Sequence, residues 1–261
     1  MTTIDFISAL FCQVDDHLVG IPKHPEAHLW PSEVVTLGLL NALKGVGNRA
    51  FSRWLTRDYR VLFPCLPERT RLFRLFRTHQ DWTQVFLATP TVLGVIDTDG
   101  IALIHPMREG RSPQQIGRKG LSNHRWIVGG KLWLLLNQWG LIVAWACATA
   151  NVADNTFQWL IRQCEERMIV LSDTAFHAAA GDPTNLTLCP RGEWEDRILV
   201  ETVLSMLTFV CHFKKVMHRV WAYFHARLAF TMAAFNVLAQ WHGLRPNASG
   251  FVPLFIAEFS L

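Results

Sequence analysis

The sequence has 261 residues, half of them apolar, a length that allows one large domain or two small ones around an ample hydrophobic core. The 25 Lys and Arg residues exceed the 21 Asp and Glu residues only slightly, so charge permits a nucleic-acid partner without requiring one. The six cysteines form no Cys-x-x-Cys pair and no zinc-ligand spacing, which favours reduced thiols in a cytosol over disulfides or a zinc site.

Helical periodicity dominates the first ninety residues. Thr2 or Thr3 is placed to cap a first helix, and Trp30-Pro31-Ser32-Glu33 is typical of the start of a second. We predict an all-helical N-terminal domain over residues 1–89. Its helices are expected over residues 4–18, 34–43, 48–58 and 68–87.

From Pro90 the pattern becomes rich in β-type runs, which predicts an α/β domain over residues 90–244. Two of the runs are joined through Asn-Gln-Trp-Gly, so we expect an antiparallel hairpin there rather than a membrane-spanning helix. The stretch 224–242 is apolar all round and is predicted to be buried, whereas 245–261 is predicted to be an irregular tail. Strands are expected over residues 92–97, 126–136, 141–149, 168–172 and 186–189, with a long loop over 107–125 and a helix ending near 167.

The helix expected after Arg197 has a polar stripe along one side. At 100° per residue its polar members share an arc of roughly 80°, and the opposite arc is rich in Val and Leu. Such a helix is half buried. One carboxylate followed by a line of cationic side chains on its polar side would suit binding of an anionic partner through a metal ion. The stripe contains Arg197, Glu201, Ser205, Thr208, His212, Lys215 and Arg219.

Three carboxylates lie at the expected ends of separate elements. Asp97 and Asp173 each follow an apolar strand, and Glu201 lies near the start of a helix. Acids placed in this way can converge above a sheet and hold two hard divalent cations, as two-metal phosphoryl transfer requires. Asp99 is the alternative for the first position, although Asp99-Gly100 is also a strong turn signal.

Basic residues supply candidates for contacts with phosphate groups. Arg71, Arg74 and Arg77 follow one another at three-residue steps, which indicates either a DNA-facing edge or an ordinary solvated helix face. Arg197 lies one turn before Glu201 and either pairs with it or reaches a phosphate. The candidate DNA-binding residues are Arg71, Arg74, Arg77, Lys119, Lys131, Arg197, His212 and Lys215.

Several short motifs follow one another in a fixed order along residues 1–243. They are Asp15-Asp16, Phe63-Pro64-Cys65-Leu66-Pro67, Val95-Ile96-Asp97-Thr98, Gly129-Gly130-Lys131, Asn151-Val152-Ala153-Asp154, Leu171-Ser172-Asp173-Thr174-Ala175-Phe176 and the Arg-x-x-x-Glu-Thr-Val of Arg197 to Val203. In this order the chain resembles the DDE transposases of bacterial insertion sequences. The resemblance is to the branch that opens with a helical domain.

This resemblance implies a ribonuclease H-like core, with a mixed sheet and flanking helices, behind a helical domain that recognises the element's ends. It implies an enzyme that cuts DNA at these ends and joins the 3′-hydroxyl to target DNA. Asp97, Asp173 and Glu201 would hold two Mg²⁺ ions, with Mn²⁺ as the alternative. The expected partner is double-stranded DNA, both the terminal inverted repeats of the element and the target. A homodimer is expected to bind it in the bacterial cytoplasm, at the nucleoid, and no membrane association is expected.

Two departures keep alternatives open. Related transposases have a Tyr three residues before the motif Arg and a Lys seven residues after the Glu, where this chain has Trp194 and Thr208. Lys215, two turns further along the stripe, is a possible substitute for that Lys. One alternative is a catalytically degenerate DNA-binding protein derived from a transposase, and the other is a structure-specific nuclease of the same fold.

Overall fold

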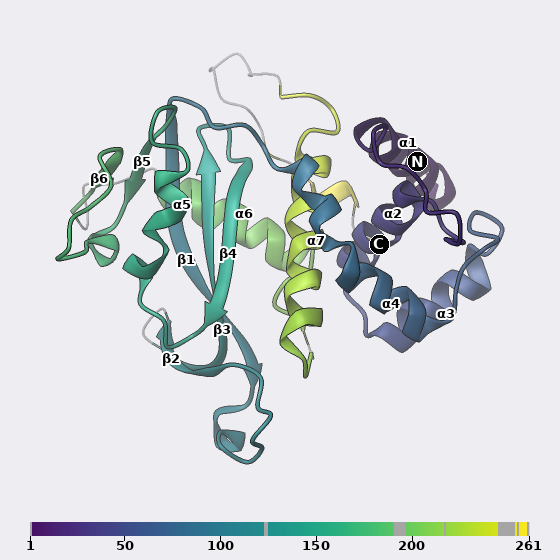
Figure 1. Cartoon of the computed structure of the whole chain (residues 1–261), viewed down its shortest axis with the longest axis horizontal. Helices are drawn as coiled ribbons and strands as arrows, with labels where there is room; N and C mark the ends of the chain where they lie inside the picture. Colours follow the sequence, from purple (N-terminus) through teal and green to yellow (C-terminus); the bar gives the residue numbers. More distant parts are fainter. Residues whose placement is uncertain are drawn as a thin grey trace. The chain divides into compact units, whose positions relative to one another are not determined.

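The structure, a computed structural model, divides the chain into two compact units (Figure 1). We call them the helical unit (Met1–Phe86, Leu207–Leu238 and Ile256–Leu261) and the sheet unit (Leu87–Met206 and Ala239–Phe255). The residues that it describes are 2–122, 125–190, 197–216, 218–244, 254, 256–259 and 261, and the side chain of Arg197 is outside this set.

The helical unit begins as the sequence predicts. The hydroxyl of Thr2 accepts the backbone N–H of Asp5 at 3.2 Å, and the Asp5 carboxylate accepts the N–H of Thr2 at 3.0 Å, a reciprocal cap. Gly45 has φ +59° and ends the second helix in the left-handed conformation that favours glycine. The first helices are α1 (Thr3–His17), α2 (Pro31–Lys44), α3 (Asn48–Asp58) and α4 (Arg69–Thr78), followed by the 3₁₀ segment η1 (Gln80–Phe86).

Helix α7 (Trp221–Ala239) is buried on all sides from Ala226 to Leu238, which confirms most of the burial predicted for 224–242, whereas residues 239–242 are half-buried or exposed. Its Phe230 ring lies so close to α2 that a Cβ on Gly38 would approach it to 2.3 Å. Only glycine therefore allows this approach. A further 3₁₀ turn, η5 (Ala257–Phe259), brings Phe259 against Phe6 of α1, with ring centroids 5.6 Å apart.

The sheet unit contains a mixed sheet, so the predicted α/β class with a mixed sheet and flanking helices is confirmed. Antiparallel pairs join β3 to β1, β2 and β4, whereas β5 is parallel to β1 and β6 is parallel to β5. The order is β2-β3-β1-β5-β6. Strand β2 pairs with the first part of β3, and β4 pairs with the part of β3 that follows. The strands are β1 (Leu93–Ile104), β2 (Arg118–Ser122), β3 (Arg125–Asn137), β4 (Ile142–Thr149), β5 (Ile169–Ser172) and β6 (Leu186–Leu188).

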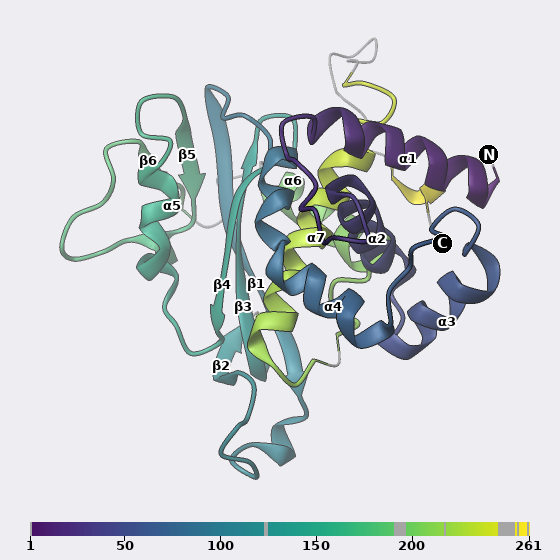
Figure 2. The same ribbon diagram turned by 45° about the vertical axis from the view of Figure 1, so that its right-hand side comes forward.

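Helices cover both faces of this sheet (Figures 1 and 2). On one face, α5 (Gln158–Arg162) contributes Leu160 and Ile161 to a core with Ile96, Trp133 and Val170. On the other face lie residues 197–206 of α6 (Arg197–Phe209), where a Cβ on Gly140 would approach Leu199 to 3.0 Å. Because strand side chains alternate between faces, the neighbours of Ile96 point toward the α6 side.

Four predicted elements differ from the structure. The helix predicted over 68–87 ends at Thr78, and most of its remaining length is the 3₁₀ segment η1. Strand β1 does not end at Asp97 and no turn forms at Asp99-Gly100, because pairing with β3 continues through both residues to Ile104. The expected loop over 107–125 contains strand β2 and most of a short 3₁₀ turn, η2 (Pro106–Arg108). The helix predicted to run to residue 167 is only a 3₁₀ turn, η3 (Asp154–Phe157), followed by α5.

The predicted polar stripe is interrupted as well. Helix α6 ends at Phe209, and His212 adopts the left-handed conformation with φ +51°. The backbone N–H of Phe213 then donates to the carbonyl of Leu207 at 3.1 Å. His212, Lys215 and Arg219 therefore lie in the connection to α7 and do not continue the helix face of Glu201.

The predicted ranges 1–89, 90–244 and 245–261 and the compact units divide the chain differently. Both place a boundary near residue 87, but residues 207–238 belong to the helical unit. The reason is packing, since the buried side of α7 meets α2 and α4 through Gly38 and through Phe76, whose ring centroid lies 5.4 Å from that of Phe230. Within the described residues, no helix combines the length and the apolar character needed to cross a membrane.

Candidate functional site

Asp97 and Asp173 lie at the same level of neighbouring parallel strands. In the ladder between β1 and β5, Val95 pairs with Leu171. Asp97 lies two residues after Val95 and Asp173 two residues after Leu171, so the two acids are in register. Parallel strands are roughly 4.8 Å apart, and period-two alternation turns both side chains to the same face. Extended by two residues beyond its last pair, this register puts the two acids at the same level of the sheet, with Asp173 one residue past the end of β5.

The face that carries Asp97 also carries Asp99. Asp97 lies opposite Leu134 and Asp99 opposite Leu132, on the α6 side of the sheet. Their exposed fractions are 9% and 4%. Carboxylates buried to this degree among leucines are stabilised only by cations or by hydrogen bonds to the charged form. Asp97 has such a bond, because its Oδ1 accepts the backbone N–H of Thr98 at 2.7 Å.

Asp173 has a structural role that bears on any test of its chemistry. It follows β5 directly, is half-buried, and accepts the backbone N–H of Ala175 through Oδ1 at 3.0 Å, which caps the 3₁₀ turn η4 (Thr174–Phe176). A substitution that removes the side-chain oxygen would disturb this turn as well as the charge. Asparagine keeps the acceptor and removes only the charge.

Glu201, the third predicted ligand, is exposed on α6, the helix that covers the face carrying Asp97. Within the described residues, no three His, Cys, Asp or Glu side chains are grouped closely enough to hold a metal ion. The register thus relates two of the three predicted ligands, and the third is an exposed residue of the helix that covers the same face. Trp194 lies outside the described residues, and Thr208 is half-buried on α6.

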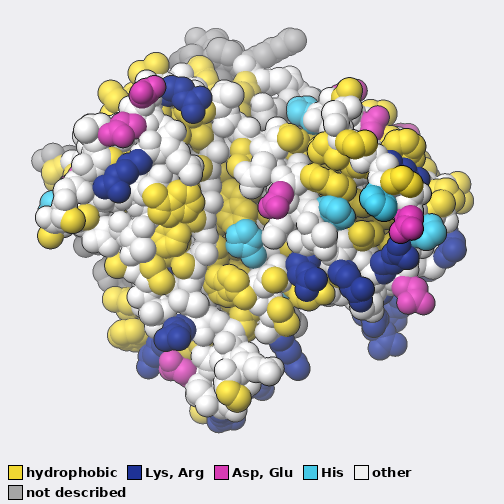
Figure 3. Space-filling view, viewed as in Figure 1, with side chains coloured by type: hydrophobic (Ala, Val, Ile, Leu, Met, Phe, Trp, Pro, Cys, Tyr) yellow, Lys and Arg dark blue, Asp and Glu magenta, His cyan; other side chains and the backbone are white. Residues whose placement is uncertain are grey.

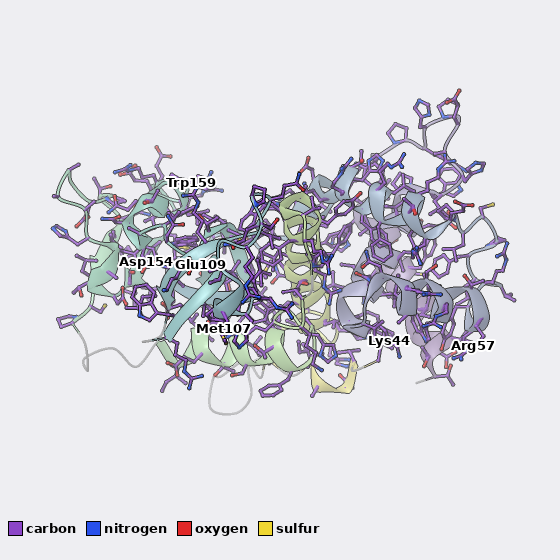
Figure 4. The ribbon with its side chains drawn as sticks, turned by 90° about the horizontal axis from the view of Figure 1, so that it is seen from below. Lys44, Arg57, Met107, Glu109, Asp154 and Trp159 are labelled. Atoms are coloured by element: carbon purple, nitrogen blue, oxygen red, sulfur yellow. The ribbon has the colours of Figure 1, made fainter. Side chains whose placement is uncertain are left out.

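Lys131 has a buried ion pair in place of an exposed ammonium group. Its Nζ lies 2.8 Å from Oδ1 of Asp154 and donates to the carbonyl of Val152 at 3.1 Å, and the residue is 7% exposed. Asp154 lies on the segment that leads into α5 (Figure 4). Because Lys131 pairs with Gly100 across β1 and β3, it points to the face opposite Asp97. This position argues for a structural role and against the predicted phosphate contact.

The other basic candidates are distributed over both units. Arg71, Arg74 and Arg77 lie on the exposed side of α4, where lysine and arginine side chains line the surface in Figure 3. Lys119 on β2 is exposed, lies 3.8 Å from the Glu109 carboxylate and stands over the ring of Trp126. His212 and Lys215 lie in the connection between α6 and α7.

Sequence reasoning missed one functional candidate altogether. Arg227 is the single Lys, Arg, Asp or Glu between Trp221 and Ala239, within a helix that otherwise has the composition of a core. The residue is 7% exposed, and its guanidinium donates to neutral oxygen atoms of α2. A lone arginine inside an apolar helix was the signal, because such a charge must find buried partners.

No protein-family model matches the chain, and no curated protein matches it either. The functional assignment therefore rests on the motifs and on the geometry just described. That geometry places two in-register acids on one buried face and exposed basic residues elsewhere. Such an arrangement is suited to holding hard cations beside an anionic polymer.

Proposed function

We propose that the protein is a DNA transposase of the DDE type with a ribonuclease H-like sheet unit. It would cleave DNA at the ends of an insertion sequence and join the resulting 3′-hydroxyl to target DNA. The observation that supports this most is the shared register of Asp97 and Asp173, which continues the pairing of Val95 with Leu171 in the ladder between β1 and β5.

The donor set suits magnesium. Asp97 and Asp173 offer hard carboxylate oxygens on one face of the sheet, and Glu201 offers a third carboxylate from the helix on that face. When bound, two Mg²⁺ ions would supply positive charge at the attacking and the leaving oxygen of the phosphodiester. Mn²⁺ has the same ligand preference and is the alternative.

The chain's own residues would bind and orient the DNA. In cleavage a water oxygen forms a bond to phosphorus and the bond to the 3′-oxygen breaks, which leaves a 3′-hydroxyl and a 5′-phosphate. In joining, that hydroxyl forms the new phosphodiester and a target 3′-oxygen leaves. Exposed arginines such as Arg71, Arg74 and Arg77 would hold backbone phosphates independently of sequence.

The test uses charge-removing substitutions that keep the local hydrogen bonds. Asp97→Asn retains an acceptor for the Thr98 N–H, and Asp173→Asn retains one for Ala175. Purified full-length protein is incubated with element-end DNA and Mg²⁺, and nicked and joined strands are resolved on denaturing gels. We expect each of these variants, and Glu201→Gln, to lower the cleavage rate by about 1000-fold or more, because each removes one metal ligand. Glu166→Gln, an exposed acid of the same unit, is the matched control and should cleave like the wild type.

Three outcomes separate this proposal from its rivals. Full cleavage by Asp173→Asn would overturn the proposed metal ligands. Binding to element ends without metal-dependent cleavage by the wild type would identify the degenerate DNA-binding protein. Cleavage without strand joining would identify the structure-specific nuclease. Asp99→Asn, assayed beside Asp97→Asn, decides which of the two acids on β1 acts as the first ligand.

A further inference from the structure

The helical unit contains a cavity of about 570 Å³, within the size range of small-molecule sites. Three stretches of chain surround it. They are the end of α2 with the turn into α3, the connection between α6 and α7, and the first turns of α7. The residues that line this cavity belong to the helical unit, whereas Asp97 and Asp173 belong to the sheet unit.

The charges that line the cavity have a single sign. Four cationic side chains contribute to its wall, and no acidic residue does so within the described part of the chain. Lys215 and Arg219 are exposed, whereas Arg227 is buried. The four cations are Lys214, Lys215, Arg219 and Arg227.

Arg227 contributes a positive charge that its hydrogen bonds do not neutralise. Its guanidinium donates to the carbonyl of Asn41, to Asn41 Oδ1 at 3.1 Å, to the carbonyl of Ala42 at 2.8 Å and to that of Cys211 at 3.4 Å. All of these acceptors are neutral. Burial lowers the pKa of Arg227 to about 10, so the group still carries its charge at neutral pH.

Two further donors belong to the same wall. Asn41 is 7% exposed, its Oδ1 accepts from Arg227, and its Nδ2 donates no hydrogen bond within the described structure. Gly47 is the N-cap residue before α3 and has no side chain to cap it, so backbone N–H groups at the start of this 11-residue helix remain available. A helix N-terminus carries partial positive charge and favours anions. An orphan amide donor, a helix N-terminus and four cations thus share one cavity.

We propose that this cavity binds a phosphate group of a polynucleotide backbone. Phosphate has the negative charge and the number of acceptor oxygens that this set of donors and cations requires. The exposed Lys215 and Arg219 extend the positive surface to the outside, as a continuous strand needs and a small enclosed ligand does not. The anion site stands on the cavity alone, and the choice of DNA as the bearer of the phosphate rests on the proposed function.

The first measurement tests the anion site without any catalysis. Calorimetric titration of the metal-free full-length protein with inorganic pyrophosphate should show saturable binding. Asn41→Asp keeps an acceptor for Arg227 and keeps the size of the side chain, but replaces the free donor by a second anionic oxygen. We expect it to bind pyrophosphate roughly 10- to 100-fold more weakly, with an unchanged circular dichroism spectrum.

The second measurement asks whether DNA supplies the phosphate. Binding of a mixed-sequence duplex is measured against salt concentration, again without divalent metal. The double variant Lys215→Ala/Arg219→Ala should reduce the magnitude of the negative slope of log K against log salt by roughly 2, since two phosphate contacts disappear. The control is Arg53→Ala/Arg60→Ala, which removes two exposed cations of the same unit that do not line the cavity, and its slope should stay closer to that of the wild type.

Each outcome of the two measurements supports or overturns a stated part of the proposal. Pyrophosphate binding that Asn41→Asp weakens, together with the lower salt slope of the cavity variant, supports the proposal. Absence of pyrophosphate binding by the wild type overturns the anion site. Pyrophosphate binding with an unaltered salt slope overturns the assignment to DNA and identifies a small phosphate compound as the ligand. Because no step requires cleavage, an inactive Asp97, Asp173 and Glu201 site would not change these outcomes.

Discussion

The two units bury a cation in different ways. In the sheet unit, Lys131 meets the carboxylate of Asp154 at 2.8 Å, so the buried charge is neutralised. In the helical unit, the partners of Arg227 within the described chain are carbonyl and amide oxygens, so its charge extends into the cavity that it lines. A buried cation with a carboxylate partner stabilises a fold, whereas one held by neutral oxygens also remains available to an anion.

The chemistry of the two side chains explains the difference. A lysine ammonium is a compact charge, and one carboxylate with one carbonyl satisfies most of it. A guanidinium carries five N–H donors in a rigid fork, and carbonyls at the end of a helix are well placed to accept them. Arg227 thereby also satisfies the carbonyls of Asn41 and Ala42 near the end of α2. Stability and anion binding are therefore coupled at Arg227.

The largest expected effect comes from breaking the neutralised pair. Asp154→Leu leaves the Lys131 ammonium buried without its carboxylate, and we expect the free energy of unfolding to fall by about 3–5 kcal/mol. Urea denaturation of the full-length protein measures it. The double variant Lys131→Met/Asp154→Leu should recover most of the loss, because no charge is then buried. A single variant as stable as the wild type would contradict the assigned role of the pair.

Arg227→Met should lower the free energy of unfolding slightly less, by about 2–4 kcal/mol, because it leaves buried carbonyl oxygens without donors. Here no apolar side chain restores the stability, because three of the four acceptors are backbone carbonyls, which cannot be substituted away. The same urea experiment compares the two sites. Recovery of wild-type stability by any apolar residue at position 227 would remove the contrast between the units.

The cavity also predicts a pH dependence of stability. Burial, assisted by the charge of Arg227, lowers the pKa of His218 from 6.5 to about 4. On acidification the His218 side chain takes up a proton near pH 6.5 in the unfolded chain but only near pH 4 in the folded chain. The stability that neutral His218 contributes is therefore complete above pH 6.5 and is lost as the pH falls toward 4. We expect a loss of about 2 kcal/mol over this range after allowance for partial exposure. His218→Gln should flatten that part of the profile, and an unchanged profile would show that His218 titrates normally.

The smallest effect is a gain. Asn41→Asp places a carboxylate beside Arg227, and we expect a rise of about 1 kcal/mol in the free energy of unfolding, because part of the buried charge is then neutralised. Thermal unfolding at pH 7 measures it. This substitution would convert the helical unit to the arrangement seen in the sheet unit, stabilised and closed to anions. A variant that is destabilised would mean that the Asn41 amide is needed for packing.

Local signals made much of the fold predictable. The reciprocal cap of Thr2 and Asp5 and the glycine at position 45 act within a few residues, and the start of α1 and the end of α2 follow from them. Errors arose where distant contacts decided the conformation. Pairing of β1 with β3 overrides the turn signal at Asp99-Gly100, and periodicity gives no warning that His212 adopts φ +51°.

The candidate site shows the same limit. Sequence reasoning selected Asp97 and Asp173 from their places after apolar runs, and the structure put them in register for a reason that no local pattern contains. Lys131 looked available for phosphate because its partner, Asp154, lies 23 residues away. Arg227 escaped notice because burial of a charge depends on neighbours from two other parts of the chain.

The shared register of Asp97 and Asp173 has a consequence for insertions and deletions. The alignment of β5 on β1 is set by the ladder itself, so the intervening chain between residues 105 and 117 can change in length without moving either acid. A single residue inserted within β5 has the opposite result, because it turns Asp173 to the far face of the sheet. Insertions across residues 105–117 should therefore be tolerated, whereas a single insertion within Ile169–Ser172 should abolish metal-dependent cleavage.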